Sequence, residues 1–156
     1  SQRPVQFDLT RDSFSLLWSR RASQVNQTLW FGLSQLAQID APLVIATTEV
    51  GRPSITNRQF TIVDMAGLNN PDIVFNGFSA ERLLTVDAPD WIYVPHIDYT
   101  RTTNAILTHP EFARRYDYYP AEQLGYVLAV AIRRDSAEYE RLTAIMQAAG
   151  QQPAAP

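Results

Sequence analysis

The sequence predicts a single α/β domain, in which a mixed sheet of about four or more strands carries helices packed on its faces. Three observations predict this class. A long segment near the start has the three-to-four-residue spacing of apolar side chains that is typical of an amphipathic helix. Short runs rich in β-branched and aromatic residues follow it, and segments with helical character separate most of these runs. The 156 residues have the usual size of one domain, which we assign to residues 1–150, with a flexible tail at 151–156.

The first helix is predicted to run from about Asp12 to Ile39. Thr10 or Asp12 can cap its start, and Pro42 marks its end because the residue before a proline is pushed out of the helical region. Its apolar side chains recur at steps of three and four and form one face: Phe14, Trp18, Ala22, Val25, Leu29, Leu33 and Leu36.

Short strands are predicted where β-branched and aromatic residues cluster between turn residues. The polar segment between the first two strands suits a longer connection, and its Asn57-Arg58 pair also suits a hairpin, so their pairing direction stays open. The predicted strands cover residues 43–50, 60–65, 91–94 and 126–133.

Further helices are predicted between and after these strands. Asn70 can cap the first of them, and Asp135 can cap the last, with Glu138 in the reciprocal capping position. These segments begin near Pro71, cover 79–85, cover 100–116 with a break before Pro110, and cover 136–149.

Composition excludes several classes of function. The formal net charge is -3 with a pI near 5.3, and no basic stripe with interleaved aromatics is present, so nucleic acid is not expected as a partner. The absence of cysteine excludes disulfides and thiolate metal sites. No run approaches the roughly 18 consecutive apolar residues that span a bilayer.

Acidic residues and a histidine lie at or just after the predicted carboxyl ends of strands: Glu49, Asp64, His96 and Asp98. Open α/β sheets bind ligands at this edge, so the cluster suits a divalent metal or acid/base chemistry. Strand-end acids also cap helices and bond to loop amides, which is the simpler interpretation. Because His109 looks like part of the helix break before Pro110, we assign no metal and no cofactor.

A group of aromatic residues surrounds the same region of the sequence. Their rings suit stacking on a sugar, although aromatic residues near strands more often pack in the core or at its rim. The group consists of Trp91, Tyr93, Tyr99, Tyr116, Tyr118 and Tyr119.

Two stretches carry a family resemblance: Thr48-Glu49-Val50-Gly51 leading to 61–73 (TIVDMAGLNNPDI), and 89–96 (PDWIYVPH). The center of the first stretch is the run 64–71 (DMAGLNNP), whose asparagine and proline open a helix. A strand introduced by Pro89-Asp90 follows about twenty residues later. Together the stretches resemble the soluble C-terminal domain of polytopic bacterial membrane glycosyltransferases that use polyprenyl-phosphate sugars, including mannosyltransferase-like and arabinofuranosyltransferase-like proteins of the cell envelope.

The resemblance implies a domain on the extracytoplasmic (periplasmic) face of the cell membrane. The catalytic acid of such proteins lies on an early loop of the membrane portion, so no catalytic residue is assigned to this chain. The implied role is to position a glycan acceptor or to brace the membrane part of the same polypeptide, with a glycan or a polyprenyl-linked sugar as partner. Binding residues are then expected among Glu49, Asp64, Asn69, Asp90, Trp91, His96, Asp98 and Tyr99.

Two alternatives stay open. One is a stand-alone, metal-assisted hydrolase that uses Glu49, Asp64, His96 and Asp98. The other is a separate binding or scaffolding module without a membrane partner.

Overall fold

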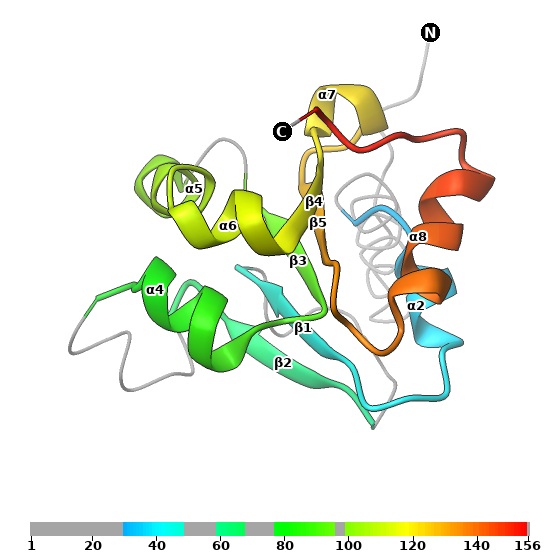
Figure 1. Ribbon diagram of the computed structural model, residues 1–156, viewed down its shortest axis with the longest axis horizontal. Helices are drawn as coiled ribbons and strands as arrows, with labels where there is room; N and C mark the ends of the chain where they lie inside the picture. Colours follow the sequence, from blue (N-terminus) through cyan, green and yellow to red (C-terminus); the bar gives the residue numbers. More distant parts are fainter. Residues whose placement is uncertain (1–29, 49–58, 68–76, 96–98, 156) are drawn as a thin grey trace, which may run out of the picture.

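A five-stranded mixed sheet forms the center of the computed structural model, which describes residues 30–48, 59–67, 77–95 and 99–155 (Figure 1). The strand order is β2-β1-β3-β5-β4. Strands β2, β1 and β3 run parallel to one another, and β5 lies antiparallel to both β3 and β4. The predicted α/β class is confirmed. The strands are β1 (Val44–Thr47), β2 (Thr61–Asp64), β3 (Trp91–Val94), β4 (Tyr116–Tyr119) and β5 (Ala129–Arg133).

Parallel pairing of β1 and β2 answers the question that the sequence leaves open. Val44 lies opposite Thr61 and Thr47 lies opposite Asp64, so both strands end at the same edge. A two-residue hairpin cannot join parallel strands, which excludes a turn at Asn57-Arg58 as their connection.

Helices cover both faces of the sheet, with α2 and α8 on one side and α4, α5 and α6 on the other (Figure 1). A π-helix, η1, directly continues α4. The bounds are α2 (Leu33–Ala37), α4 (Ala80–Arg82), η1 (Leu83–Asp87), α5 (Thr100–Leu107), α6 (Pro110–Arg115), α7 (Ala121–Leu124) and α8 (Tyr139–Ala148).

The two core clusters follow from the alternation of side chains along β3. All four residues of this central strand are buried. Trp91 and Tyr93 pack with residues of α2 and α8, whereas Ile92 and Val94 pack with residues of η1, α5 and α6. Successive side chains of a strand point to opposite faces, so one strand supplies both layers of the core.

In its described part, the single helix predicted from Asp12 to Ile39 is confirmed over Leu33–Ala37 and wrong at residues 30–32. Gly32 has a left-handed φ of 73° and directly precedes α2, so the backbone breaks there. Residues 12–29 lie outside the described residues, as does the helix predicted to begin at Pro71. The predicted strands of β1, β2 and β3 are confirmed, and so are the helical piece after Ser79 and the helix break before Pro110.

The C-terminal third differs from the prediction in detail. Strand β4 and helix α7 are not predicted, and Tyr116 opens β4 instead of ending a helix. Strand β5 begins at Ala129, not at residue 126. Asp135 does not cap α8: its carboxylate lies 2.8 Å from Arg133 Nε, while the Ser136 hydroxyl accepts from the Glu138 amide at 3.1 Å.

Residues 150–155 lie against the rest of the domain. The amide of Gln151 donates to Met146 O, the amide of Ala154 donates to Tyr118 O, and the side chain of Gln123 donates to Gln152 O. The segment expected to be a flexible tail therefore makes contacts with α7, α8 and β4.

Candidate functional site

The carboxyl ends of β1, β2 and β3 meet at one edge of the sheet, which is where open α/β sheets place their ligands. Three described residues that are relevant to a site lie there. Thr48 follows β1, Asp64 ends β2, and Tyr99 precedes α5 after β3. Since β1 lies between β2 and β3, the carboxyl ends of β2 and β3 are two strand spacings apart, about 10 Å.

Asp64 holds the turn that follows β2. Its Oδ1 accepts hydrogen bonds from the amides of Ala66 at 3.0 Å and of Gly67 at 3.1 Å, and the side chain is buried. Gly67 has a left-handed φ of 80°, which a glycine adopts without a steric penalty. This is the local turn that an aspartate side chain makes with the backbone ahead of it. At least one carboxylate oxygen is thus used to fix the loop.

Thr48 opens the first resembling stretch but is not among the expected binding residues. It is buried, and its Oγ1 has no hydrogen-bond partner in the part of the chain that the structure describes. A buried hydroxyl without a partner costs free energy, so such a group marks a place where a polar contact is to be sought. A threonine directly after a strand carries no signal in the sequence, because threonine is common in and beside strands for its shape alone.

Tyr99 lies at the start of α5 and is half-buried. Its carbonyl accepts from the amide of Thr103 at 2.9 Å, and the hydroxyl of Thr103 donates to Pro95 O at 2.5 Å. These bonds fasten the first turn of α5 to the end of β3. Tyr99 therefore lies after the carboxyl end of β3, and its role in binding stays a prediction.

Asp90 lies at the opposite edge, which corrects its inclusion with the other binding residues. It precedes β3 and exchanges two hydrogen bonds with Val44: its amide donates to Val44 O, and its Oδ2 accepts from the Val44 amide, both at 2.8 Å. Asp64 is opposite Thr47, three residues further along β1, which is roughly 10 Å at the rise of an extended strand. The two carboxylates do not share a site.

The carboxylate of Asp90 is fully engaged within the fold. Its Oδ1 accepts from Ser136 Oγ at 2.7 Å and from Arg133 Nη2 at 3.1 Å. Arg133 Nη1 also donates to Ala88 O at 2.7 Å, and Ala88 has a positive φ of 41°. This cluster therefore joins β1, the entry to β3, the end of β5 and the segment before α8.

Trp91 is a core residue, which corrects the expectation that a sugar stacks on it. Its side chain has 0% exposure and packs edge to face with Tyr93 at 5.7 Å between ring centroids. The ring also lies beside Gly32, where an added Cβ would be 3.4 Å from Trp91 Cη2. No ring face is accessible to a ligand. The remaining expected binding residues, Glu49, Asn69, His96 and Asp98, lie outside the described residues.

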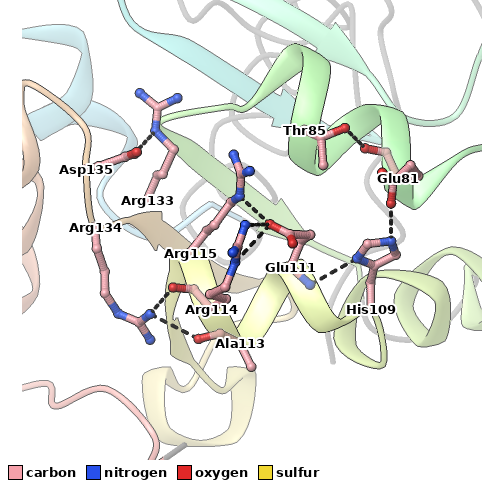
Figure 2. A network of polar contacts seen from close by, with 10 residues as sticks. All are labelled: Glu81, Thr85, His109, Glu111, Ala113, Arg114, Arg115, Arg133, Arg134 and Asp135. Atoms are coloured by element: carbon pink, nitrogen blue, oxygen red, sulfur yellow. Dashed lines mark hydrogen bonds and ion pairs between the residues drawn. The ribbon is translucent and has the colours of Figure 1, made fainter.

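A second polar cluster connects α4 with α6 (Figure 2). His109 Nε2 lies 2.6 Å from Glu81 Oε2, while His109 Nδ1 accepts from the amide of Glu111 at 3.1 Å. This geometry assigns the proton to Nε2 and makes His109 the N-cap of α6. Both ring nitrogens have partners, so the imidazole has no lone pair left to act as a general base.

Glu111 accepts from two arginines on the next turn of the same helix (Figure 2). Its Oε2 lies 2.7 Å from Arg114 Nη2 and 2.5 Å from Arg115 Nε. Hydrogen bonds from Arg114, and then from Arg115, hold the pKa of Glu111 below its ordinary value. Arg134 donates to the carbonyls of Ala113 and Arg114 and so ends the helix. The cluster is a set of helix caps and ion pairs.

Two further findings concern the described ranges alone. Within them, no group of three or more His, Cys, Asp or Glu side chains is arranged to hold a metal ion. No helix of these ranges is long and apolar enough to cross a membrane.

No protein-family model matches the chain, and neither curated proteins nor solved structures give a significant match.

Proposed function

We propose that this chain is a non-catalytic extracytoplasmic domain of a membrane glycosyltransferase of cell-envelope glycan synthesis. In this role it positions the glycan acceptor or braces the membrane part of the same polypeptide. The reacting groups belong to the membrane part, and the chain supplies a rigid α/β platform. The proposal rests on the family resemblance of the two stretches around Asp64 and Asp90.

The observation that carries the proposal is the role of Asp64. This residue is the first of the resembling turn, and its Oδ1 accepts from the amides of Ala66 and Gly67. Asp90, which opens the second resembling stretch, accepts from Val44, Arg133 and Ser136. Both carboxylates stabilise the fold by accepting hydrogen bonds within it, as expected of residues with a structural role and not a catalytic one. This supports a platform more than a catalytic center.

Membrane topology is the first test. The chain has no cysteine, so Val86→Cys on the exposed surface of η1, where Val86 is 70% exposed, introduces a single thiol into it. In the complete gene product, expressed in intact cells, we expect a membrane-impermeant maleimide to label this thiol before lysis. The unsubstituted protein is the control for labelling elsewhere in the polypeptide. Labelling after permeabilisation alone would contradict the extracytoplasmic location.

Glycosyl transfer is the second test. Membranes that contain the complete gene product are assayed with radiolabelled polyprenyl-phosphate mannose and polyprenyl-phosphate arabinofuranose. Asp64→Asn keeps a side-chain oxygen that can accept the two amide bonds, so we expect the kcat of transfer to stay within about twofold of the parent value. Asp64→Ala removes that acceptor and is expected to raise the KM for acceptor through a loosened turn.

The metal-assisted hydrolase makes the opposite prediction for the same variants. If Asp64 binds a metal, the isolated chain takes up Mn²⁺ or Zn²⁺ in a calorimeter, and Asp64→Asn abolishes that uptake. Metal binding that Asp64→Asn removes, without a change in thermal stability, would overturn the platform proposal.

A further inference from the structure

The outer edge of β4 is the feature that carries a further inference. The amide of Arg134 donates to Arg115 O, and in the register of β4 with β5 Asp117 lies opposite Ile132 and Tyr119 opposite Val130. In an antiparallel ladder alternate residues face the neighbour, so Asp117 and Tyr119 bond to β5. The backbone groups of Tyr116 and Tyr118 therefore point away from the sheet.

The chain itself occupies three of these four outward groups. The Tyr116 amide donates to Phe112 O, and Tyr116 O accepts from Arg134 Nη2 at 2.8 Å. Tyr118 O accepts from the amide of Ala154 at 2.7 Å. The first two bonds come from α6 and from the end of β5, whereas the third comes from the C-terminal segment. Tyr118 is thus the point of this edge that depends on residues 150–155.

The C-terminal segment is held in place from three sides. Gly150 has a left-handed φ of 70° where the chain leaves α8, and the amide of Gln151 donates to Met146 O at 2.9 Å. Gln123 of α7 donates to Gln152 O at 2.7 Å. The segment then runs from α8 toward α7 and β4 (Figure 1). These bonds position the Ala154 amide beside Tyr118 O, to which it donates.

The composition of the segment suits a cover that does not itself extend the sheet. Pro153 directly precedes Ala154 and has no amide to donate, so the segment cannot act as a regular new edge strand. Strand β4 reads Tyr-Asp-Tyr-Tyr, and an exposed edge of such residues is a template for another strand.

We propose that residues 150–155 form an edge cover that keeps β4 from pairing with β4 of a second copy of this chain. When the cover lifts, Tyr118 exchanges two hydrogen bonds with Tyr118 of the second copy, in an antiparallel pair. Tyr116 stays blocked by Phe112 and Arg134, which limits the contact to this single pair and makes the association weak.

Disulfide cross-linking tests the proposal directly. Hydrogen-bonded antiparallel partners have Cα atoms about 5.5 Å apart, within the range of a disulfide. In a Tyr118→Cys background we expect Ala154→Pro, which removes the covering amide, to raise the cross-linked fraction under copper-phenanthroline oxidation about fivefold, the factor that the loss of one net hydrogen bond gives. The matched control is Ala155→Pro, since Ala155 follows the covering residue and is exposed.

Two further variants keep the outcome interpretable. Deletion of residues 152–156 removes the cover but retains the Gln151 amide that ends α8, and it is expected to cross-link at least as strongly as Ala154→Pro. Ile62→Cys places a thiol on β2, at the other edge of the sheet, and is expected not to respond to Ala154→Pro. Equal cross-linking with and without the cover, or cross-linking through Ile62→Cys instead, would overturn the proposal.

Discussion

Arg133 and Asp90 face each other across the entry to β3, with Arg133 Nη2 3.1 Å from Asp90 Oδ1. The backbones of the same two residues are also bonded, since the Arg133 amide donates to Asp90 O at 3.1 Å. The pair therefore fixes the end of β5 to the start of β3 through both main chain and side chain. Because the Asp90 carboxylate also accepts from Val44 and Ser136, one residue couples three strands to the start of the α8 region.

Asp90→Ala is expected to be strongly destabilising. It removes the acceptor of the Val44 amide and of Arg133 Nη2 at a part-buried site, and removal of one partner from a buried pair costs up to about 3–5 kcal/mol. Urea unfolding followed by circular dichroism measures the change. Asp135→Ala is the matched control, because this second partner of Arg133 is 79% exposed and such pairs contribute under about 1 kcal/mol. Equal effects of the two substitutions would contradict the assigned role of Asp90.

Gly32→Ala is expected to cost more stability than the same change at Gly125. Both glycines have a left-handed φ, of 73° and 70°, which costs an alanine about 1–2 kcal/mol. At Gly32 the new Cβ would also lie 3.0 Å from Ile145 Cγ2, whereas at Gly125 nothing lies within 4 Å. Overpacking adds about 1–3 kcal/mol at the first site alone. Thermal unfolding of the two variants side by side measures the difference, and equal midpoints would rule out the close packing of α2 on α8.

The parallel part of the sheet could be predicted because its strands carry their own signal. The runs that contain β1, β2 and β3 are rich in β-branched or aromatic residues and end at turn residues. Strand β4 has no such boundary, since Tyr116 follows α6 without a break. Its strand conformation depends on pairing with β5, a contact between residues distant in sequence, and a local pattern does not contain that information.

The candidate site could be predicted in part for the same reason. Asp64 ends a strand, and its turn is encoded by its own side chain and by Gly67. The burial of Trp91 depends on α2 and α8 covering it, which local sequence does not reveal. The Thr48 hydroxyl, which has no hydrogen-bond partner among the described residues, likewise depends on its tertiary surroundings.

His109→Ala is expected to destabilise α6 more than His109→Asn. Alanine cannot accept from the Glu111 amide, and loss of an N-cap costs about 0.5–2 kcal/mol. Asparagine is itself a good N-cap and replaces that acceptor. Glu81→Ala breaks the other contact of His109, but Glu81 is 69% exposed, so the expected cost is below about 1 kcal/mol. Chemical denaturation of the three variants gives the order, and a larger loss in Glu81→Ala than in His109→Ala would contradict the capping role.

Alkaline pH is expected to unfold the protein through its buried tyrosines. Burial, and next the charge of Asp117, raises the pKa of Tyr119 to about 12 from 10.0. Burial also raises the pKa of Tyr116, whose hydroxyl donates to Pro89 O. Because the raised values belong to the folded state, this stabilisation is fully present below pH 10 and is lost as the pH rises toward 12.

Tyr119→Phe separates this effect from general alkaline damage. The variant has no phenol to ionise at this position, so its free energy of unfolding is expected to fall less steeply between pH 10 and pH 12 than that of the parent. Urea titrations at pH 8 give the baseline difference between the two proteins, and absorbance at 295 nm follows tyrosine ionisation directly. Parallel stability curves over the whole range would mean that Tyr119 ionises as easily in the folded as in the unfolded state. That result would contradict the burial of Tyr119 in β4 and in the core cluster of Trp91 and Tyr93.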